Sequence, residues 1–559
     1  MNSVTTLSMT SSIQASRDLL KQMRVLFEHA VRTLAEQCSV SGELDAELVD
    51  RHQPACFELA WANADLLAAE TVLRVTVAPS PLNSQLSLCF AVEGIQAVIQ
   101  RLESIYRDLG MDASALRDFS VAATYTELKD AVLNSKAMSD LGKSVAKLNG
   151  EIAEIKLDDD LALAQDAFRR FSALQVAPLA SDIHRRDLTV PEALLKPLRE
   201  MGVFGLSIPE SFGGSAPEGS DNTLMMIAVT EALSEGSLAA AGSLITRPEI
   251  LARALMSGGS DAQKAYWLPK IAVGEPLCAI SITEPDFGSD VASLSLKATR
   301  TTGGWLLNGA KTWCTFAGKA GLIMVVARTD ADKASGYKGL SIMLVEKPSF
   351  EGHEFHFEQG SGTLTGRAIP TMGYRGMHSF DLAFENFFVP DNRVIGEEKG
   401  VGRGFYYTMA GMVGGRIQTA ARACGVMRAA LSAAIQYCLD RQVFGAPLID
   451  FSLTQLKIAR MAARFNACRQ LTYEVGRRLE SGGDRMEASL VKLLACRSAE
   501  MITRESLQLH GGMGYAEEMA VSRYFVDARV LSIFEGAEET LALKVVARTL
   551  LENAVKAAA

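Results

Sequence analysis

The chain has 559 residues, several times the length of a typical domain of about 100–200 residues, so we expect three or four domains. Its composition, 48% hydrophobic and 22% charged, is typical of a globular protein and excludes a mostly disordered or collagen-like chain. The net charge of -9 argues against nucleic-acid binding, because no overall positive field attracts a phosphate backbone.

No uninterrupted apolar run has transmembrane length, and the N-terminus has no basic segment followed by an apolar core. We therefore expect neither a membrane span nor a secretory signal. The nine cysteines are odd in number, widely spread and contain no Cys-x-x-Cys pair, which argues against a disulfide framework and a structural zinc site. The sequence thus predicts a cytoplasmic protein without a bound metal.

In chain order, residues 1–150 are predicted to form a mostly helical extension. Apolar residues recur at the i, i+3, i+4 spacing of an amphipathic helix over 17–37 and again over 88–109. The charged stretch 151–160 is a candidate joint to a second helical domain, which we place at 158–276.

The hydrophobic period changes over 277–395, which we predict to be a small β domain. Apolar runs rich in Val and Ile occur at 322–327 and 340–345. The pairs Gly303-Gly304 and Asn308-Gly309 indicate tight turns. The helical period then returns over a last domain, 396–559. Its long helical segments are expected at 405–440, 450–481, 485–512 and 537–556.

Several motifs fail on spacing or context. His353 and His356 lack the i, i+4 separation that places two zinc ligands on one helix face, so we interpret both as surface histidines. Gly400-Val-Gly-Arg-Gly404 follows no βαβ pattern, which favours a loop before a helix over a dinucleotide-binding turn. The sequence supports neither a metalloenzyme nor a nucleotide hydrolase.

Three segments carry residues suited to chemistry. The first, from Ile280 to Asp290, combines hydroxyls, backbone amides and a glycine, which suits a polar ring edge or a phosphate, with a simple turn as the alternative. Trp313 and Thr315 are two residues apart on a predicted strand, so they should share a face and could cover and hydrogen-bond a flat cofactor. Glu535 lies in an apolar neighbourhood beside a glycine, where burial would make a carboxylate a usable base near neutrality.

With these segments, the chain resembles the acyl-CoA dehydrogenase family, flavoenzymes that oxidise an acyl-CoA to its 2,3-enoyl-CoA. Six motifs occur in the family's order and together cover about 158–559. The resemblance implies a mainly α fold with a central β domain: a helical bundle, a β-barrel-like domain and a second helical bundle, here preceded by the helical extension. The motifs are Thr283-Glu-Pro-x-x-Gly-Ser-Asp290, Lys311-Thr-Trp-Cys-Thr315, Phe384-Glu-Asn-x-x-Val-Pro390, Arg441-Gln-x-Phe-Gly445, Gln508-Leu-His-Gly-Gly-Met-Gly514 and Phe534-Glu-Gly536.

The resemblance implies that FAD is the cofactor and that its two ends contact different subunits. The isoalloxazine end would be bound within one subunit, and the adenine and pyrophosphate end would lie across a dimer interface. Dimerisation would then be obligatory for cofactor binding. The residues implied at the isoalloxazine end are Ile280, Ile282, Thr283, Ser289, Trp313 and Thr315, and those implied to contact the neighbouring subunit's FAD are Arg441, Phe444, Gln455, Gln508, Gly511 and Gly512.

By the same resemblance, Glu535 is the catalytic base and Ser289 and Arg416 meet the substrate. An isovaleryl-type variant, in which the base occupies the position of Gly415, is excluded because glycine has no carboxylate. Glu535 would take the α-proton while its backbone amide and a ribityl hydroxyl of FAD stabilise the thioester oxygen. Electrons would then pass to an electron-transfer flavoprotein.

The sequence departs from the family just after the base. The family commonly has Thr and Gln where this chain has Ala537 and Glu539, both near the flavin. Loss of the hydroxyl removes one expected hydrogen bond to the cofactor, and an ionised Glu539 could not donate one.

The extension, with the segments Arg247-Pro248 and Tyr374-Arg-Gly-Met-His378, makes the chain similar to a subgroup that converts (2S)-methylsuccinyl-CoA to mesaconyl-CoA in the ethylmalonyl-CoA pathway. Arg247 is then a candidate anchor for the substrate's second carboxylate, with solvent or Glu249 as alternative partners. We expect the extension to pack on the core where some relatives place a second dimer, which favours a homodimer over a tetramer. The alternatives are a short branched monocarboxylic acyl-CoA dehydrogenase and, remotely, a DNA-associated alkylation-response flavoprotein of the same fold.

Overall fold

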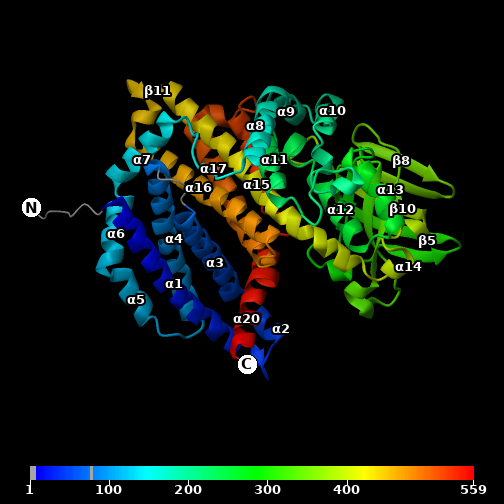
Figure 1. Ribbon diagram of the computed structural model, residues 1–559, viewed down its shortest axis with the longest axis horizontal. Coiled ribbons are helices and arrows are strands. Elements are labelled where there is room, and N and C mark those ends of the chain that lie inside the picture. The colour runs from blue at the N-terminus through cyan, green and yellow to red at the C-terminus, as the bar shows by residue number, and fades with distance from the viewer. Residues whose placement is uncertain (1–7, 76–79, 559) are drawn as a thin grey trace, which may run out of the picture. The chain divides into compact units, whose positions relative to one another are not determined.

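The computed structural model describes residues 8–75 and 80–558 (Figure 1). These residues form two compact units. The first contains the residues up to Asp159 and those from Thr419 onward, and the second contains Asp160–Gln418.

The first unit begins with the extension, which is helical as predicted. The two amphipathic segments are confirmed as parts of α1 and α4, and α1 buries Leu20, Phe27 and Leu34 along one face. The helices of the extension are α1 (Met9–Gln37), α2 (Ala46–Arg51), α3 (Gln53–Arg74), α4 (Pro81–Asp108), α5 (Ser114–Val121), α6 (Ala123–Leu133) and α7 (Ser135–Lys147), with a small hairpin of β1 (Ser39–Val40) and β2 (Glu43–Leu44) after α1.

Helices from the end of the chain complete this unit, and the four C-terminal helical segments are confirmed. Figure 1 shows α3 and α4 beside α16 and α17. The C-terminal elements are α15 (Gly404–Asp440), which belongs to this unit from Thr419 onward, β11 (Gln442–Val443), β12 (Ala446–Pro447), α16 (Ser452–Glu480), α17 (Arg485–His510), α18 (Ala520–Val530), α19 (Glu538–Thr540), a π-helical segment Leu541–Ala547 and α20 (Arg548–Ala558).

The extension and the C-terminal helices share one core, so the extension packs on the dehydrogenase part of the chain as expected. Trp61 of α3 packs with Leu490 and Leu493 of α17, and the Arg497 guanidinium lies 3.9 Å from the Trp61 ring centroid. Helix α7 approaches α16 so closely that a Cβ on Gly142 would lie 2.0 Å from the Gln455 carbonyl oxygen.

Among the described residues, one helix has the length and hydropathy of a membrane span. This helix is α4, with a mean hydropathy of 1.2 in its most apolar window. In the structure, 72% of that window is buried, and α4 packs against α1, α3 and α16. Packing in the core of the first unit therefore accounts for its apolar character.

The second unit combines helices with an eight-stranded sheet, in the order β3-β6-β4-β5-β10-β9-β8 with β7 paired to β6. Its helices are α8 (Asp159–Phe171), α9 (Ala177–Arg185), α10 (Glu192–Glu200), α11 (Thr223–Gly236), α12 (Thr246–Gly258), α13 (Asp261–Ala272) and α14 (Glu397–Gly400). Its strands are β3 (Cys278–Ser281), β4 (Lys297–Thr301), β5 (Gly304–Thr315), β6 (Leu322–Arg328), β7 (Leu340–Glu346), β8 (Glu354–Gln359), β9 (Gly362–Ala368) and β10 (Ser379–Pro390).

Strand β6 is apolar throughout because both of its faces are buried. Leu322, Met324 and Val326 face α12 and α13 in one core. The alternate residues Ile323 and Val325 face a second core, which also contains side chains from β5, β9 and β10 of the same sheet. The two predicted apolar runs are thus confirmed as β6 and β7, and the helix, strand, helix fold class is confirmed.

One of the two predicted turns is wrong. Gly303 does form the tight β4–β5 turn, with φ 75°. Asn308 and Gly309, however, lie inside β5, where the Asn308 side chain accepts a hydrogen bond from the backbone of Asn386 in β10. A glycine is needed there because a Cβ would lie 3.3 Å from Leu296 Cα, so close packing rather than a turn explains the pair.

Candidate active site

The loop that carries Thr283 is anchored by a buried ion pair. Lys311 and Glu284 have side chains that are 0% and 3% exposed, with Nζ and Oε1 separated by 2.8 Å. Lys311 also donates to the Ile282 carbonyl at 2.7 Å. Burial alone would raise the pKa of Glu284, but Lys311 and the backbone amides of Ser295 and Leu296 outweigh it and lower that pKa. The carboxylate is therefore ionised and holds the loop against β5.

A β-bulge at the end of β5 presents Trp313 to solvent. The register of β5 against β10 shifts at this point, where Thr312 and Trp313 together lie opposite Asp381. Trp313 has φ 56° and is 55% exposed, whereas Thr315 is 9% exposed. The regular alternation that would place both side chains on one face is therefore absent. Thr283 still lies beside the bulge, because its carbonyl accepts a hydrogen bond from the Thr312 amide at 2.9 Å.

Thr315 is linked to the segment before β10. Its hydroxyl lies 2.9 Å from the Ser379 hydroxyl. The next backbone amide, that of Phe316, donates to the carbonyls of Met377 and His378 at 2.9 and 2.8 Å. Of the other predicted isoalloxazine contacts, Ile280 and Ile282 are half-buried and Ser289 is exposed.

Glu535 lies in a tight loop of the first unit, after α18. Its φ of 55° is unusual for a residue with a side chain, and Gly536 follows with φ 99°. The buried Lys492 of α17 donates to the Gly536 carbonyl at 2.6 Å, and the Arg422 guanidinium lies 4.8 Å from the Phe534 ring centroid. Contacts from α15 and α17 therefore hold a strained backbone at the position predicted for the base.

The residues just after Glu535 show how the chain accommodates its departure from the family. Ala537 is half-buried and Glu539 is exposed. Glu538, between them, pairs with Arg497 of α17. This ion pair adds a further contact between the loop and α17.

Five of the six residues predicted to contact a neighbouring subunit are exposed. The β11–β12 turn presents Phe444 at 98% exposure, and a Cβ on Gly511 or Gly512 would meet no atom within 4 Å. Gln455 does not fit this expectation: it is 1% exposed beneath α7, accepts a hydrogen bond from Ser139 and donates to the Ile449 carbonyl. The extension covers it. The exposed residues are Arg441, Phe444, Gln508, Gly511 and Gly512.

Arg247, the predicted carboxylate anchor, is buried at 6% exposure in the first turn of α12, which excludes the solvent-facing alternative. Its Nη1 donates to the Ser243 carbonyl at 2.9 Å. Burial raises the pKa of Cys314, in the last part of β5, to about 12, and the positive charge of Arg247 acts in the opposite direction. Arg416 of α15 is half-buried.

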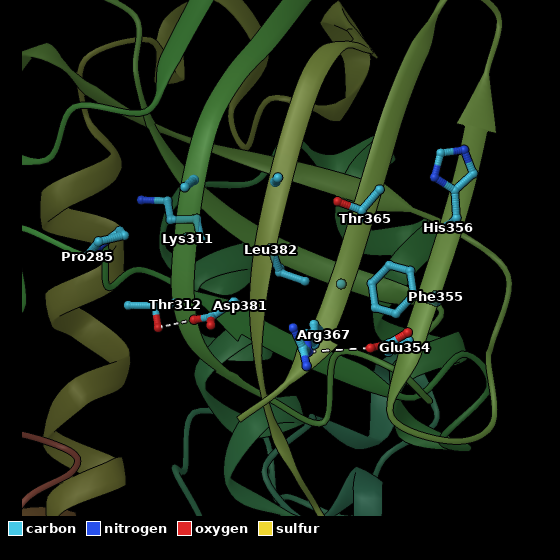
Figure 2. A pocket seen from close by; sticks show the side chains of 13 residues that line it. Pro285, Lys311, Thr312, Glu354, Phe355, His356, Thr365, Arg367, Asp381 and Leu382 are labelled. Carbon is cyan, nitrogen blue, oxygen red and sulfur yellow. Dashed lines mark hydrogen bonds and ion pairs between the residues drawn. The ribbon is translucent and has the colours of Figure 1, made fainter. Parts of the chain in front are cut away.

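A groove of the second unit lies apart from these residues. A groove of about 810 Å³ follows β5, β8, β9 and β10, and Figure 2 shows His356 and Arg367 at its wall. The Thr312–Asp381 hydrogen bond and the Arg367–Glu354 ion pair lie along it. None of the residues predicted to contact flavin lines this groove, so it does not define the proposed cofactor site.

Sequence reasoning missed the residues that hold the site in shape. Glu284 and Lys311 belong to two of the six motifs. An acidic and a basic residue among apolar neighbours indicate a buried ion pair, and this signal was available in the sequence. Lys492 and Arg422 lie in long helices more than 40 residues from the Glu535 loop, with no local signal to connect them.

Comparisons with known proteins identify the family of the chain. Models of the N-terminal, middle and C-terminal domains of acyl-CoA dehydrogenases match residues 158–275, 279–387 and 402–551. The chain is 35% identical over 556 residues to (2S)-methylsuccinyl-CoA dehydrogenase of Cereibacter sphaeroides, which covers 96% of this chain and 97% of that relative. This similarity therefore includes most of the extension.

Two solved structures resemble the chain over a shorter part. Butyryl-CoA dehydrogenase of Megasphaera elsdenii has a TM-score of 0.65 at 28% identity and covers 71% of this chain and 100% of its own. A structure described as the electron transferring flavoprotein of Acidaminococcus fermentans has a TM-score of 0.64 at 27% identity and covers 71% of this chain and 98% of its own.

Proposed function

We propose that the protein oxidises (2S)-methylsuccinyl-CoA to mesaconyl-CoA. The chain belongs to the acyl-CoA dehydrogenase family. It is an oxidoreductase that acts on the CH–CH bond of an acyl-CoA, and FAD is its cofactor. The choice of substrate rests on one observation: the similarity to the Cereibacter relative, over 96% of this chain, runs through the helical extension. Family membership alone would leave the acyl group open.

The residues at the end of β5 fit the isoalloxazine of FAD. Trp313 is held outward by the bulge, where its indole could cover a flat ring system, and Thr283 lies beside it. Ile280, Ile282, Ser289 and Thr315 complete the proposed contact set. When bound, the flavin supplies the acceptor for the hydride that leaves the substrate's β-carbon.

The exposed residues of the first unit support a homodimer. Phe444 at 98% and Tyr515 at 87% exposure are large aromatic side chains on the surface, each available for a contact with a second subunit. In our proposal this face supplies Arg441, Gln508 and the open backbone at Gly511 to the neighbour's FAD. Gln455 takes no part, because α7 covers it. Light scattering that gives a stable tetramer would contradict the dimer.

Glu535 is the proposed base. The thioester makes the α-proton acidic only if the developing enolate oxygen is stabilised, and we assign the Glu535 backbone amide as one donor to that oxygen. Glu535 has a positive φ, a backbone conformation that is rare for a residue with a side chain. Lys492 holds this backbone in place through its hydrogen bond to the Gly536 carbonyl. One residue could thereby serve both roles. Arg416 and Ser289 would position the remainder of the acyl-CoA.

The proposed acyl group carries a second carboxylate, and Arg247 is the residue proposed to bind it. A guanidinium can bind a carboxylate through two parallel hydrogen bonds, and burial at 6% exposure strengthens such a pair. The electron acceptor is proposed to be an electron-transfer flavoprotein, a choice supported by the similarity to the Acidaminococcus structure. We further propose a cytoplasmic location and a place in the ethylmalonyl-CoA pathway.

Anaerobic reduction of the purified enzyme tests the proposal. The yellow oxidised flavin should be bleached by (2S)-methylsuccinyl-CoA faster than by 2-methylbutyryl-CoA, isobutyryl-CoA or butyryl-CoA. A preference for the methyl-terminated thioesters would replace the proposal with a branched monocarboxylic substrate. A protein that stays colourless when refolded with FAD would defeat the flavin site itself.

A further inference from the structure

Three side chains from distant segments converge at one point of the second unit. Asp187 follows α9, His353 precedes β8, and His378 precedes β10. Their ligating atoms all lie within 4.8 Å of one another. The His378 Nε2 atom is 3.0 Å from Asp187 Oδ1 and 3.1 Å from His353 Nε2. His353 Nε2 is also 3.0 Å from the Asp187 backbone carbonyl oxygen.

The two ring nitrogens share the oxygens of one residue. If both Nε2 atoms carry a proton, each can donate to an oxygen of Asp187, but the two nitrogens, both acting as donors, then lie only 3.1 Å apart. If one Nε2 is unprotonated, its lone pair faces an Asp187 oxygen that also has only lone pairs to offer. A cation in the middle removes the conflict, because both imidazole lone pairs and the carboxylate can then point at it.

We propose that Asp187, His353 and His378 form a binding site for a divalent transition metal of the Zn²⁺ class. Two neutral imidazoles and one carboxylate are ligands that Zn²⁺ commonly takes. Metal–ligand bonds of about 2.0–2.1 Å at tetrahedral angles place neighbouring ligand atoms about 3.3 Å apart. His378 Nε2 lies 3.0 Å from Asp187 Oδ1 and 3.1 Å from His353 Nε2, and one ligand atom of each residue lies within 4.8 Å of the others, so a small approach of His353 to the carboxylate brings all three onto one ion.

The surroundings fit a metal that binds from solvent. The His378 side chain is 4% exposed and forms the buried end of the cluster. The side chains of His353 and Asp187 are 45% and 41% exposed, which gives the ion a path. The Nδ1 atom of His378 has no hydrogen-bond partner among the described residues, so its polar contacts are all made by Nε2.

Arg375 limits the affinity of this site. Its Nε lies 3.6 Å from Asp187 Oδ1, and the guanidinium is fixed by hydrogen bonds to the carbonyls of Thr371 and His184. Its charge neutralises part of the carboxylate and repels a cation. The proposed site therefore has moderate rather than tight affinity, and replacing Arg375 with Gln should strengthen binding.

A metal here would stabilise a segment that contacts the proposed flavin site. The His378 carbonyl accepts the Phe316 amide at 2.8 Å, and Ser379 bonds Thr315 at 2.9 Å. An ion that joins His378 to His353 and Asp187 would restrict the segment that supports Thr315. We assign the ion a structural role and no step in the reaction.

Metal titration of the tag-free, chelator-treated holoenzyme tests the site. Calorimetry with Zn²⁺ should show one site per chain, and Co²⁺ should give the visible absorption of a tetrahedral complex. His353→Gln should weaken Zn²⁺ binding at least about 10-fold. The control is His356→Gln, three residues away on β8, whose side chain bonds Glu358 at 3.2 Å. The Zn²⁺ affinity of this control variant should equal that of the wild type.

Two results would overturn the site. One is the absence of stoichiometric Zn²⁺ binding to the wild-type chain, and the other is an equal loss of affinity in the His353 and His356 variants. Because His378 is buried, His378→Gln could unfold the segment, so circular dichroism accompanies each variant. Arg375→Gln gives an independent readout: unchanged or weaker binding in that folded variant contradicts the proposed coordination by Asp187.

Discussion

Replacement of Arg247 by Met tests the proposed dicarboxylic substrate most directly. Met keeps much of the volume of the side chain and removes the guanidinium. Arg247 is 6% exposed, and the nearby Glu249 carboxylate is bonded to Arg253 Nε at 2.8 Å on the same helix. A substrate carboxylate paired with Arg247 would therefore be shielded from water, where a charge pair is strong.

The size of the effect follows from that burial. Removing one partner of a desolvated, hydrogen-bonded charge pair costs about 2–5 kcal/mol. Since each 1.4 kcal/mol corresponds to a tenfold change, kcat/KM for (2S)-methylsuccinyl-CoA should fall by roughly 30-fold or more. The value for 2-methylbutyryl-CoA, which has a methyl group in place of the carboxylate, should be unchanged or higher. The variant should thus reverse or erase the preference between the two thioesters.

The assay is steady-state turnover with an artificial electron acceptor, with both thioesters and with flavin content measured for each preparation. Arg253→Met is the matched control on α12, because Arg253 is paired with Asp221 and Glu249. It should lower stability, since Glu249 stays buried without this partner, but leave the ratio of the two kcat/KM values unchanged. If Arg247→Met lowers both kcat/KM values equally, or if Arg253→Met shifts the ratio as much, Arg247 does not bind the carboxylate.

Three further experiments address Glu535, the packing of the extension and the buried Lys347. Glu535→Gln should keep its flavin but slow flavin reduction by about 10²–10⁴-fold in stopped-flow measurements, and near-normal reduction would refute its role as base. Gly142→Ala places a Cβ 2.0 Å from the Gln455 carbonyl oxygen, so α7 must shift. We expect the free energy of unfolding, measured in urea, to fall by about 1–3 kcal/mol. Lys143→Ala, at an exposed neighbouring position, is the control and should leave it unchanged. Burial lowers the pKa of Lys347 from 10.5 to about 7. Between pH 7 and 10.5 the folded state therefore binds fewer protons than the unfolded state, so the free energy of unfolding should rise with pH across this window. Lys347→Met should reduce this rise, and an unchanged pH profile of the urea midpoint would contradict it.

The sequence by itself was sufficient for the elements, their order and the family. Helix periods located α1, α4 and the C-terminal helices, because an amphipathic stripe depends only on the 3.6-residue geometry of the helix and on one buried face. The change to short apolar runs located β6 and β7 for the same local reason. Motifs such as Thr283–Asp290 identified the family because their residues are contiguous in the chain.

The tertiary structure decided the features that depend on contacts between distant segments. Trp313 is exposed and Thr315 buried because β10 pairs with β5 through a bulge, which breaks the alternation that a regular strand would have. Gln455 is covered because α7, more than 300 residues earlier, packs directly on its backbone.

The same reason explains the buried polar residues. Lys311 is buried in the fold, and the approach of Glu284 and of the Ile282 carbonyl makes that burial possible. Asp187 and His378 are 191 residues apart, so no local spacing rule could have brought them together. Local periodicity reports the geometry of one element, whereas burial and the convergence of polar groups are set by which other element packs against it.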